Sequence, residues 1–118
     1  MQSIAKSACS VGLWAAVALV PTAASAAAPV PDEVAALARS SGCLACHGLV
    51  RKQVGPGFAQ IAERYRGDAG APDRLAGKIR HGSVGTWGRV IMPRQPQVSE
   101  ADAQRLAAWV LARPAPPP

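Results

Sequence analysis

The stretch CLACHG, residues 43–48, decides how the rest of this sequence is interpreted. Its two cysteines lie three positions apart, and a histidine follows the second directly. On a helix, positions i, i+3 and i+4 share one face, so we expect the side chains of Cys43, Cys46 and His47 to converge on one partner. Three kinds of site fit that arrangement: a redox-active thiol pair, half of a zinc site, or the attachment point of a larger group.

The first thirty residues have the composition of an export signal. Lys6 is the only charge before Asp32, the apolar run VGLWAAVALV (11–20) follows it, and Ala24-Ser25-Ala26 is a small-residue cleavage site. An uncleaved anchor is the alternative, but the apolar run is shorter than the roughly 20 residues that a spanning helix needs. We therefore expect a signal peptide over 1–26, cleaved near Ala26, and a periplasmic domain over 27–118 without stable membrane insertion.

Charge and cysteine content constrain that exported domain. The chain has 13 basic and 7 acidic residues, a net charge of +6, and loss of Lys6 leaves the exported part basic. Of its three cysteines, Cys9 belongs to the leader, so two remain. As a disulfide, Cys43 and Cys46 would close only a very short loop. Because exported domains this small usually need disulfides, a metal or a cofactor for stability, we expect another group to complete the core.

Four stretches of the exported part have helical patterns. Apolar residues recur at helical spacing, glycines or prolines stand at the ends, and Asp32 and the pair Ser99/Asp102 are candidate N-terminal caps. No alternating run suggests a strand, and residues 113–118 are expected to form a disordered tail. The prediction is an all-α fold with two long loops, 50–57 and 82–98. The predicted helices are EVAALARSSG (33–42), GFAQIAERYRG (57–67), APDRLAGKIRHG (71–82) and SEADAQRLAAWVLARP (99–114).

The C-x-x-C-H pattern is the attachment signature of c-type haem, in which each thiol forms a thioether with a vinyl group and the histidine ligates the iron. A thioredoxin-like cysteine pair belongs near a βαβ unit, which this sequence does not suggest. A structural zinc site needs four protein ligands, and Cys43, Cys46, His47 and His81 could only just supply them. The pattern therefore favours haem.

An iron held by one histidine needs a sixth ligand. After the leader, the candidates are Met92 and His81. A lone methionine more often fills a gap in a core, but Met92 stands in the proline-rich stretch VIMPRQP (90–96), which suits holding a thioether at a fixed place. His81 follows an arginine at the end of a predicted helix, which favours a solvated or propionate-side role. We therefore predict Met92 as the ligand.

At this point the sequence resembles the class I cytochromes c, most closely the short periplasmic bacterial type that donates electrons to nitrite reductases and terminal oxidases. The resemblance spans about residues 32–112. It implies the class I fold, with about four helices around one covalently bound haem. The motifs that carry it are GCLACHG (42–48), VGPGF (54–58), IRHGSVGTWG (79–88), IMP (91–93) and VSEADAQRLAAWVL (98–111).

The resemblance also implies roles for single residues. One haem c would be bound through Cys43 and Cys46, with His47 and Met92 as iron ligands. The Pro56 carbonyl would accept a hydrogen bond from the Nδ1–H of His47, which fixes the ring and raises its basicity.

Further roles concern the haem periphery. Trp87 would donate to a haem propionate, and Lys78 and Arg80 would neutralise the propionates. Where relatives often have an asparagine that bonds the methionine sulfur, this chain has Gln95, whose longer side chain could take that part.

The expected function is that of a soluble, monomeric periplasmic carrier and not an enzyme. One electron would enter and leave through the exposed haem edge as iron cycles between Fe(II) and Fe(III). Redox proteins are the expected partners, Arg51 and Lys52 are candidates to surround the haem edge, and no motif suggests nucleic-acid binding. The alternative is a haem enzyme or gas sensor with a labile sixth ligand. Candidates for haem packing or ordinary core are Phe58, Ile79 and Trp109.

Overall fold

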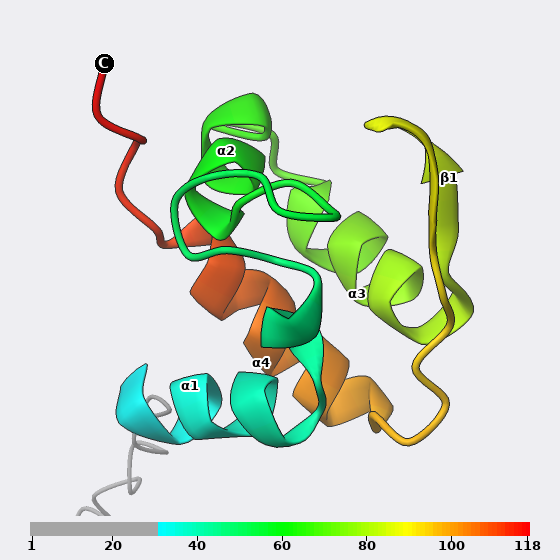
Figure 1. Cartoon of the computed structure of the whole chain (residues 1–118). Coiled ribbons are helices and arrows are strands. Elements are labelled where there is room, and N and C mark those ends of the chain that lie inside the picture. The colour runs from blue at the N-terminus through cyan, green and yellow to red at the C-terminus, as the bar shows by residue number, and fades with distance from the viewer. Residues whose placement is uncertain (1–30) are drawn as a thin grey trace, which may run out of the picture.

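The computed structural model describes residues 31–118, so the predicted signal peptide and the start of the exported domain lie outside the described residues. Helices dominate, as Figure 1 shows. None of the helices formed by residues 31–118 has the length and apolar character needed to cross a membrane. In chain order the elements are α1 (Pro31–Ser40), the 3₁₀ turn η1 (Cys43–Ala45), α2 (Phe58–Arg64), α3 (Ala71–His81), the strands β1 (Ser83–Gly85) and β2 (Gly88–Met92), and α4 (Glu100–Leu111).

The four predicted helices are confirmed, with differences at their ends. The helix α4 begins after Ser99, whose Oγ accepts a hydrogen bond from the backbone N–H of Asp102 at 3.1 Å. The prediction that Asp32 caps α1 is wrong, because the helix already begins at Pro31. A proline suits a first helical position because its φ is preset for the helix. Asp32 instead lies in the first turn, where its negative charge favours the helix N-terminus.

The core forms where α4 packs against α1, α2 and α3. Ala103 and Ala107 on α4 are fully buried, and such small side chains let neighbouring helices approach closely. Beyond the helix, Arg113 lies over the ring of Trp109 at 4.3 Å and donates from Nε to the Trp109 carbonyl at 3.1 Å. The larger buried apolar side chains are Val34, Phe58, Ile61, Leu75, Val98, Leu106, Trp109 and Val110.

A short hairpin contradicts the prediction that the chain has no sheet. The strands β1 and β2 pair antiparallel, with Gly85 opposite Gly88, so that Thr86 and Trp87 form the tip. Both glycines have positive φ, 94° and 105°, which other residues rarely adopt. The strands were missed because they are short, flanked by glycine and lack the alternating pattern on which strand prediction depends.

The CLACHG stretch, residues 43–48, is wound more tightly than an α-helix. It forms one 3₁₀ turn, which follows Gly42 in the left-handed conformation at φ 77°. The backbone N–H groups of Cys46 and His47 both donate to the carbonyl of Cys43, at 3.2 and 3.0 Å. These residues therefore do not form an α-helix, but the turn still brings the three side chains to one side of the chain.

Candidate functional site

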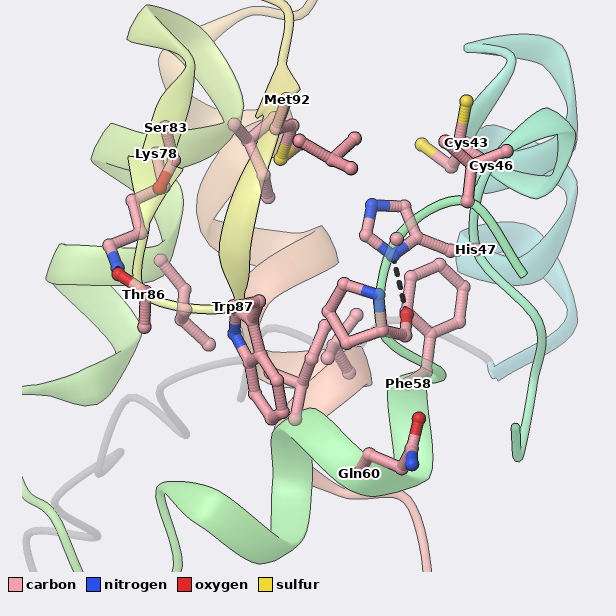
Figure 2. A pocket seen from close by; sticks show the side chains of 18 of the residues that line it. Cys43, Cys46, His47, Phe58, Gln60, Lys78, Ser83, Thr86, Trp87 and Met92 are labelled. Atoms are coloured by element: carbon pink, nitrogen blue, oxygen red, sulfur yellow. Dashed lines mark hydrogen bonds between the residues drawn. The ribbon is translucent and has the colours of Figure 1, made fainter. Parts of the chain in front are cut away.

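An open cavity of about 210 Å³ lies between the helices and the hairpin. Most of the site residues predicted from the sequence line it, and Figure 2 shows them around one space. Three other polar residues considered from the sequence, Arg80, His81 and Gln95, do not line it. The predicted residues that do are Cys43, Cys46, His47, Pro56, Lys78, Trp87 and Met92, together with the packing candidates Phe58, Ile79 and Trp109.

His47 is held in one orientation and one tautomer. The residue is 9% exposed, and its Nδ1 lies 2.7 Å from the carbonyl oxygen of Pro56, the contact that the resemblance implied. A carbonyl can only accept, so Nδ1 carries the proton and Nε2 keeps its lone pair. The imidazole is thereby prepared to bind a metal through Nε2, and the carbonyl raises its basicity as a ligand.

Two aromatic side chains pack in sequence behind the His47 imidazole. Phe58, the first residue of α2, stacks on the His47 ring with centroids 5.2 Å apart and planes 18° apart. Trp109 of α4 meets Phe58 edge to face at 5.4 Å and 76°. Two of the three packing candidates therefore hold the His47 ring from α2 and α4, a role that the sequence did not reveal because it depends on how these helices pack.

Gly55 gives a test of how closely the backbone approaches this ring. A Cβ at position 55 would lie 2.9 Å from Cε1 and 3.2 Å from Nδ1 of His47. We expect Gly55→Ala to displace the imidazole and to lower the free energy of unfolding by about 1–3 kcal/mol, as overpacking does. Denaturant unfolding and the absorption spectrum of the haem-loaded protein measure both effects.

Gly77, within α3, is the matched control. A Cβ there would meet nothing within 4 Å, so Gly77→Ala should stabilise the helix by roughly 0.5–1 kcal/mol and leave the spectrum unchanged. Equal behaviour of the two variants would contradict the close packing of Gly55 on His47.

The two cysteines are half-buried at the wall of the cavity. Burial raises the pKa of the Cys43 thiol, and a backbone hydrogen bond opposes this in part. Reactive C-x-x-C pairs instead depend on a cysteine with a lowered pKa, so the structure gives a redox-active thiol pair no support.

The zinc alternative also lacks support. Among residues 31–118, no group of three or more His, Cys, Asp or Glu side chains is arranged to hold a metal ion. His81, the fourth ligand considered from the sequence, lies instead in a separate cleft between α3 and α4.

Met92 is the last residue of β2, and its half-buried side chain lies across the cavity from His47 (Figure 2).

Gln95 does not contact the sulfur of Met92 in this structure. The Gln95 amide donates to the Pro93 carbonyl at 3.2 Å and accepts from Gln97 at 2.7 Å. These local contacts direct the longer side chain away from the cavity.

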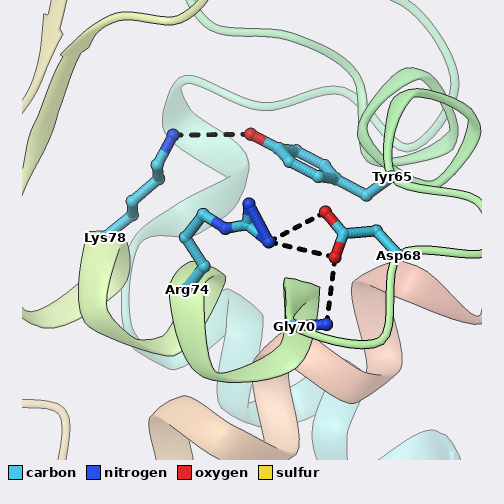
Figure 3. Close-up of polar contacts among 5 residues, drawn as sticks. All are labelled: Tyr65, Asp68, Gly70, Arg74 and Lys78. Atoms are coloured by element: carbon cyan, nitrogen blue, oxygen red, sulfur yellow. Dashed lines mark hydrogen bonds and ion pairs between the residues drawn. The ribbon is translucent and has the colours of Figure 1, made fainter.

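Polar groups gather at one rim of the cavity. Lys78 donates from Nζ to Thr86 Oγ1 at 2.8 Å and reaches the hydroxyl of Tyr65 at 3.4 Å. Figure 3 shows Lys78 and Tyr65 beside Arg74, which pairs with Asp68 at 2.8 Å. This rim therefore offers a cation and two hydroxyl groups, which are suitable partners for carboxylates of a ligand.

Arg80 does not belong to this rim. It follows Lys78 by two positions on α3, and residues two apart on a helix point in different directions. Its guanidinium lies 3.9 Å from the Glu100 carboxylate, in the same cleft as His81. This position gives no support to the predicted role of Arg80 beside the propionates.

The lining fits a large, flat, apolar group such as haem. Four aliphatic side chains of the wall are more than half exposed: Val54 at 53%, Val84 at 62%, Val90 at 58% and Ile91 at 69%. Exposed apolar clusters of this kind typically mark a binding site. Two thiols at the wall, an imidazole nitrogen and a thioether on facing sides, and a cation at the rim are the donor set that a covalently attached haem requires.

Comparison with known proteins places this chain among close relatives. The family model described as Cytochrome c matches residues 31–113. The chain is 51% identical over 75 residues to cytochrome c-552 of Hydrogenobacter thermophilus, covering 64% of this chain and 76% of that protein. It is 48% identical to cytochrome c-551 of Azotobacter vinelandii over 75 residues, with 64% and 90% covered.

Solved structures agree with these matches. The crystal structure of Nitrosomonas europaea cytochrome c552 is similar with a TM-score of 0.65 and 46% identity, covering 67% of this chain and 98% of that one. The class 1 cytochrome MtoD of Sideroxydans lithotrophicus ES-1 has a TM-score of 0.58 and 26% identity, with 69% and 92% covered. The similarities confirm the predicted fold and electron transfer, and they do not support a haem enzyme or gas sensor.

Proposed function

Because this chain belongs to the cytochrome c family, we propose that it is a periplasmic one-electron carrier whose haem iron is held by His47 and Met92. As the family relationship implies, the chain is an electron-transfer protein and not an enzyme, and one haem c is bound covalently through Cys43 and Cys46. The observation that carries the ligand assignment is the Pro56 hydrogen bond, which leaves Nε2 of His47 available, together with Met92 across the cavity.

The haem, when bound, supplies the one-electron Fe(II)/Fe(III) chemistry. The residues of the chain determine how that haem is held and how it is shielded from solvent. Phe58 and Pro56 keep the His47 imidazole in one orientation, and the aliphatic lining would exclude water from around the bound group. Lys78 and Trp87 stand at the rim, where we propose that they hold the haem carboxylates. Two protein ligands would leave no position for a substrate on the iron, and one electron would then enter and leave through the exposed haem edge without any bond being made or broken.

The partners that this surface suits are redox proteins with an acidic docking face. The chain is basic, and the exposed Arg51 and Lys52 follow the attachment turn directly, with Lys52 on the cavity wall. Complementary charge raises association rates more than affinity, which suits a carrier that must leave each partner quickly.

We further propose that residues 1–26 are a signal peptide that directs export, that residues 27–118 form the haem domain, and that the protein is a monomer.

Redox-titrated optical spectroscopy of the exported, haem-loaded protein tests this proposal. We expect a c-type spectrum, one reversible one-electron transition, and no uptake of carbon monoxide by the ferrous protein at neutral pH. Ready uptake of carbon monoxide by the unmutated protein would show that its sixth position is open or weakly held, and it would overturn the His47/Met92 assignment.

A further inference from the structure

The hairpin that carries Met92 is weakly attached to the helical body. In the described part of the chain, none of its residues belongs to the buried core, and Val84, Val90 and Ile91 are largely exposed. Figure 1 shows it beside α3 at the edge of the molecule. At its base, the backbone N–H of Gln95 donates to the Ile79 carbonyl at 3.1 Å. Something else must hold the opposite end, the tip formed by Thr86 and Trp87.

Two side-chain contacts hold this tip, and they come from different helices. From α3, Lys78 Nζ donates to Thr86 Oγ1 at 2.8 Å. From the last residue of α2, the guanidinium carbon of Arg64 lies 4.8 Å from the centre of the Trp87 ring. The tip is therefore fixed to α2 and α3, two of the helices that border the cavity, through two neighbouring residues.

Arg64 differs in this respect from the arginine two residues later. Arg66 forms an ion pair with Glu63 at 2.6 Å, whereas Arg64 has no acidic partner among the described residues. Its charge is directed instead at the face of Trp87, the favoured geometry for a cation–π contact. The sequence alone did not single out Arg64 or Thr86, since the contact partners become neighbours only once the hairpin forms.

We propose that Arg64 and Thr86 are positioning residues that keep the hairpin closed and thereby keep Met92 on the iron in both oxidation states. This inference rests on the proposed ligation by Met92. Electron transfer without rearrangement requires that the thioether stay in place, and a hairpin with no buried anchor opens unless its tip is held. Neither residue contacts the iron; both act through the position of the strand that ends at Met92.

The test uses Arg64→Met and Thr86→Val in the full haem-loaded chain. Both keep side-chain size, and each removes one contact. We expect faster amide hydrogen exchange across residues 83–92, by roughly two- to fivefold for Arg64→Met and roughly two- to tenfold for Thr86→Val. Carbon monoxide uptake, which we expect the unmutated ferrous protein to exclude, should become detectable in both variants, because it also requires the hairpin to open.

Two controls separate this effect from general destabilisation. Thr86→Ser retains the hydroxyl and should restore the exchange rates of the unmutated protein. Arg66→Met removes the same charge two residues away and should leave exchange in the hairpin unchanged. If Arg64→Met and Thr86→Val both match the unmutated protein while it excludes carbon monoxide, the positioning role is wrong and the ligand assignment stands. If the unmutated ferrous protein binds carbon monoxide readily, the ligand assignment fails, and this inference fails with it.

Discussion

Met92→Ala is expected to lower the reduction potential and to let the ferrous protein bind carbon monoxide. A thioether ligand favours the reduced iron and raises the potential, so its loss stabilises the oxidised form. Axial ligands set potentials over a range of about 0.8 V, and we expect a decrease on the order of 0.1 V. With the side chain truncated, the sixth position is open to a small ligand. Redox titration and optical detection of carbon monoxide binding measure the two effects on one sample.

Ile91→Ala is the matched control for this variant. Ile91 precedes Met92 on β2, lines the same cavity and is 69% exposed, so truncation removes apolar lining without removing a ligand. It should shift the potential far less and leave carbon monoxide excluded. If Met92→Ala behaves like Ile91→Ala, Met92 is not the ligand. Met92→His adds a contrast, because a nitrogen ligand should lower the potential while still excluding carbon monoxide.

The parts of the site that the sequence predicted well are those carried by local spacing. Cys43, Cys46 and His47 lie within one turn of the chain, so their side chains converge in the observed 3₁₀ turn as they would on an α-helix. The four helices have apolar residues at helical spacing and identifiable ends, and these signals are also local. Their existence was therefore predictable without knowledge of the tertiary packing.

The parts that the sequence did not predict depend on contacts between distant segments. Phe58 could be named as a core candidate, but its stacking on His47 and its edge contact with Trp109 require the packed α2 and α4. Arg80 shows the same limit, because it is near Lys78 in sequence but lines a different cleft, on another side of α3. The hairpin was not predicted because its apolar residues line the cavity and do not pack into the protein core. Its strands therefore lack the alternation of apolar and polar residues that usually identifies a strand.

The exposed lining of the cavity indicates how much the fold depends on its cofactor. Val54, Val84, Val90 and Ile91 are 53–69% exposed in the polypeptide alone. Fully burying one aliphatic side chain contributes about 1.5–3 kcal/mol, and each of these four is about six-tenths exposed, so covering all of them contributes roughly 4–7 kcal/mol. Domains of this size have a total stability of only about 5–15 kcal/mol. Loss of the cofactor should therefore remove a large share of the stability of the folded state.

Cys43→Ser/Cys46→Ser, exported in the same way as the unmutated protein, is expected to lack covalent haem and most of its helical structure. Serine cannot form the thioethers, so mass spectrometry of the purified variant should give the polypeptide mass alone, whereas the unmutated protein carries one haem. Far-UV circular dichroism should show a large loss of helical signal. Ala45→Ser, in the same turn at an exposed position, should keep both the haem and the signal.

The decisive comparison is between the haem-free double variant and this control. Among the described residues, the buried set includes five large apolar side chains, Phe58, Ile61, Leu75, Leu106 and Trp109, and is otherwise made of valine and alanine, apart from His47. We expect so small a core to be insufficient for cooperative folding. A haem-free variant that retains its helices and unfolds cooperatively at the temperature of the control would show that the helices fold independently. In that case the haem would bind in a cavity that is already folded without it. The exposure of the apolar side chains of the hairpin would then need another explanation.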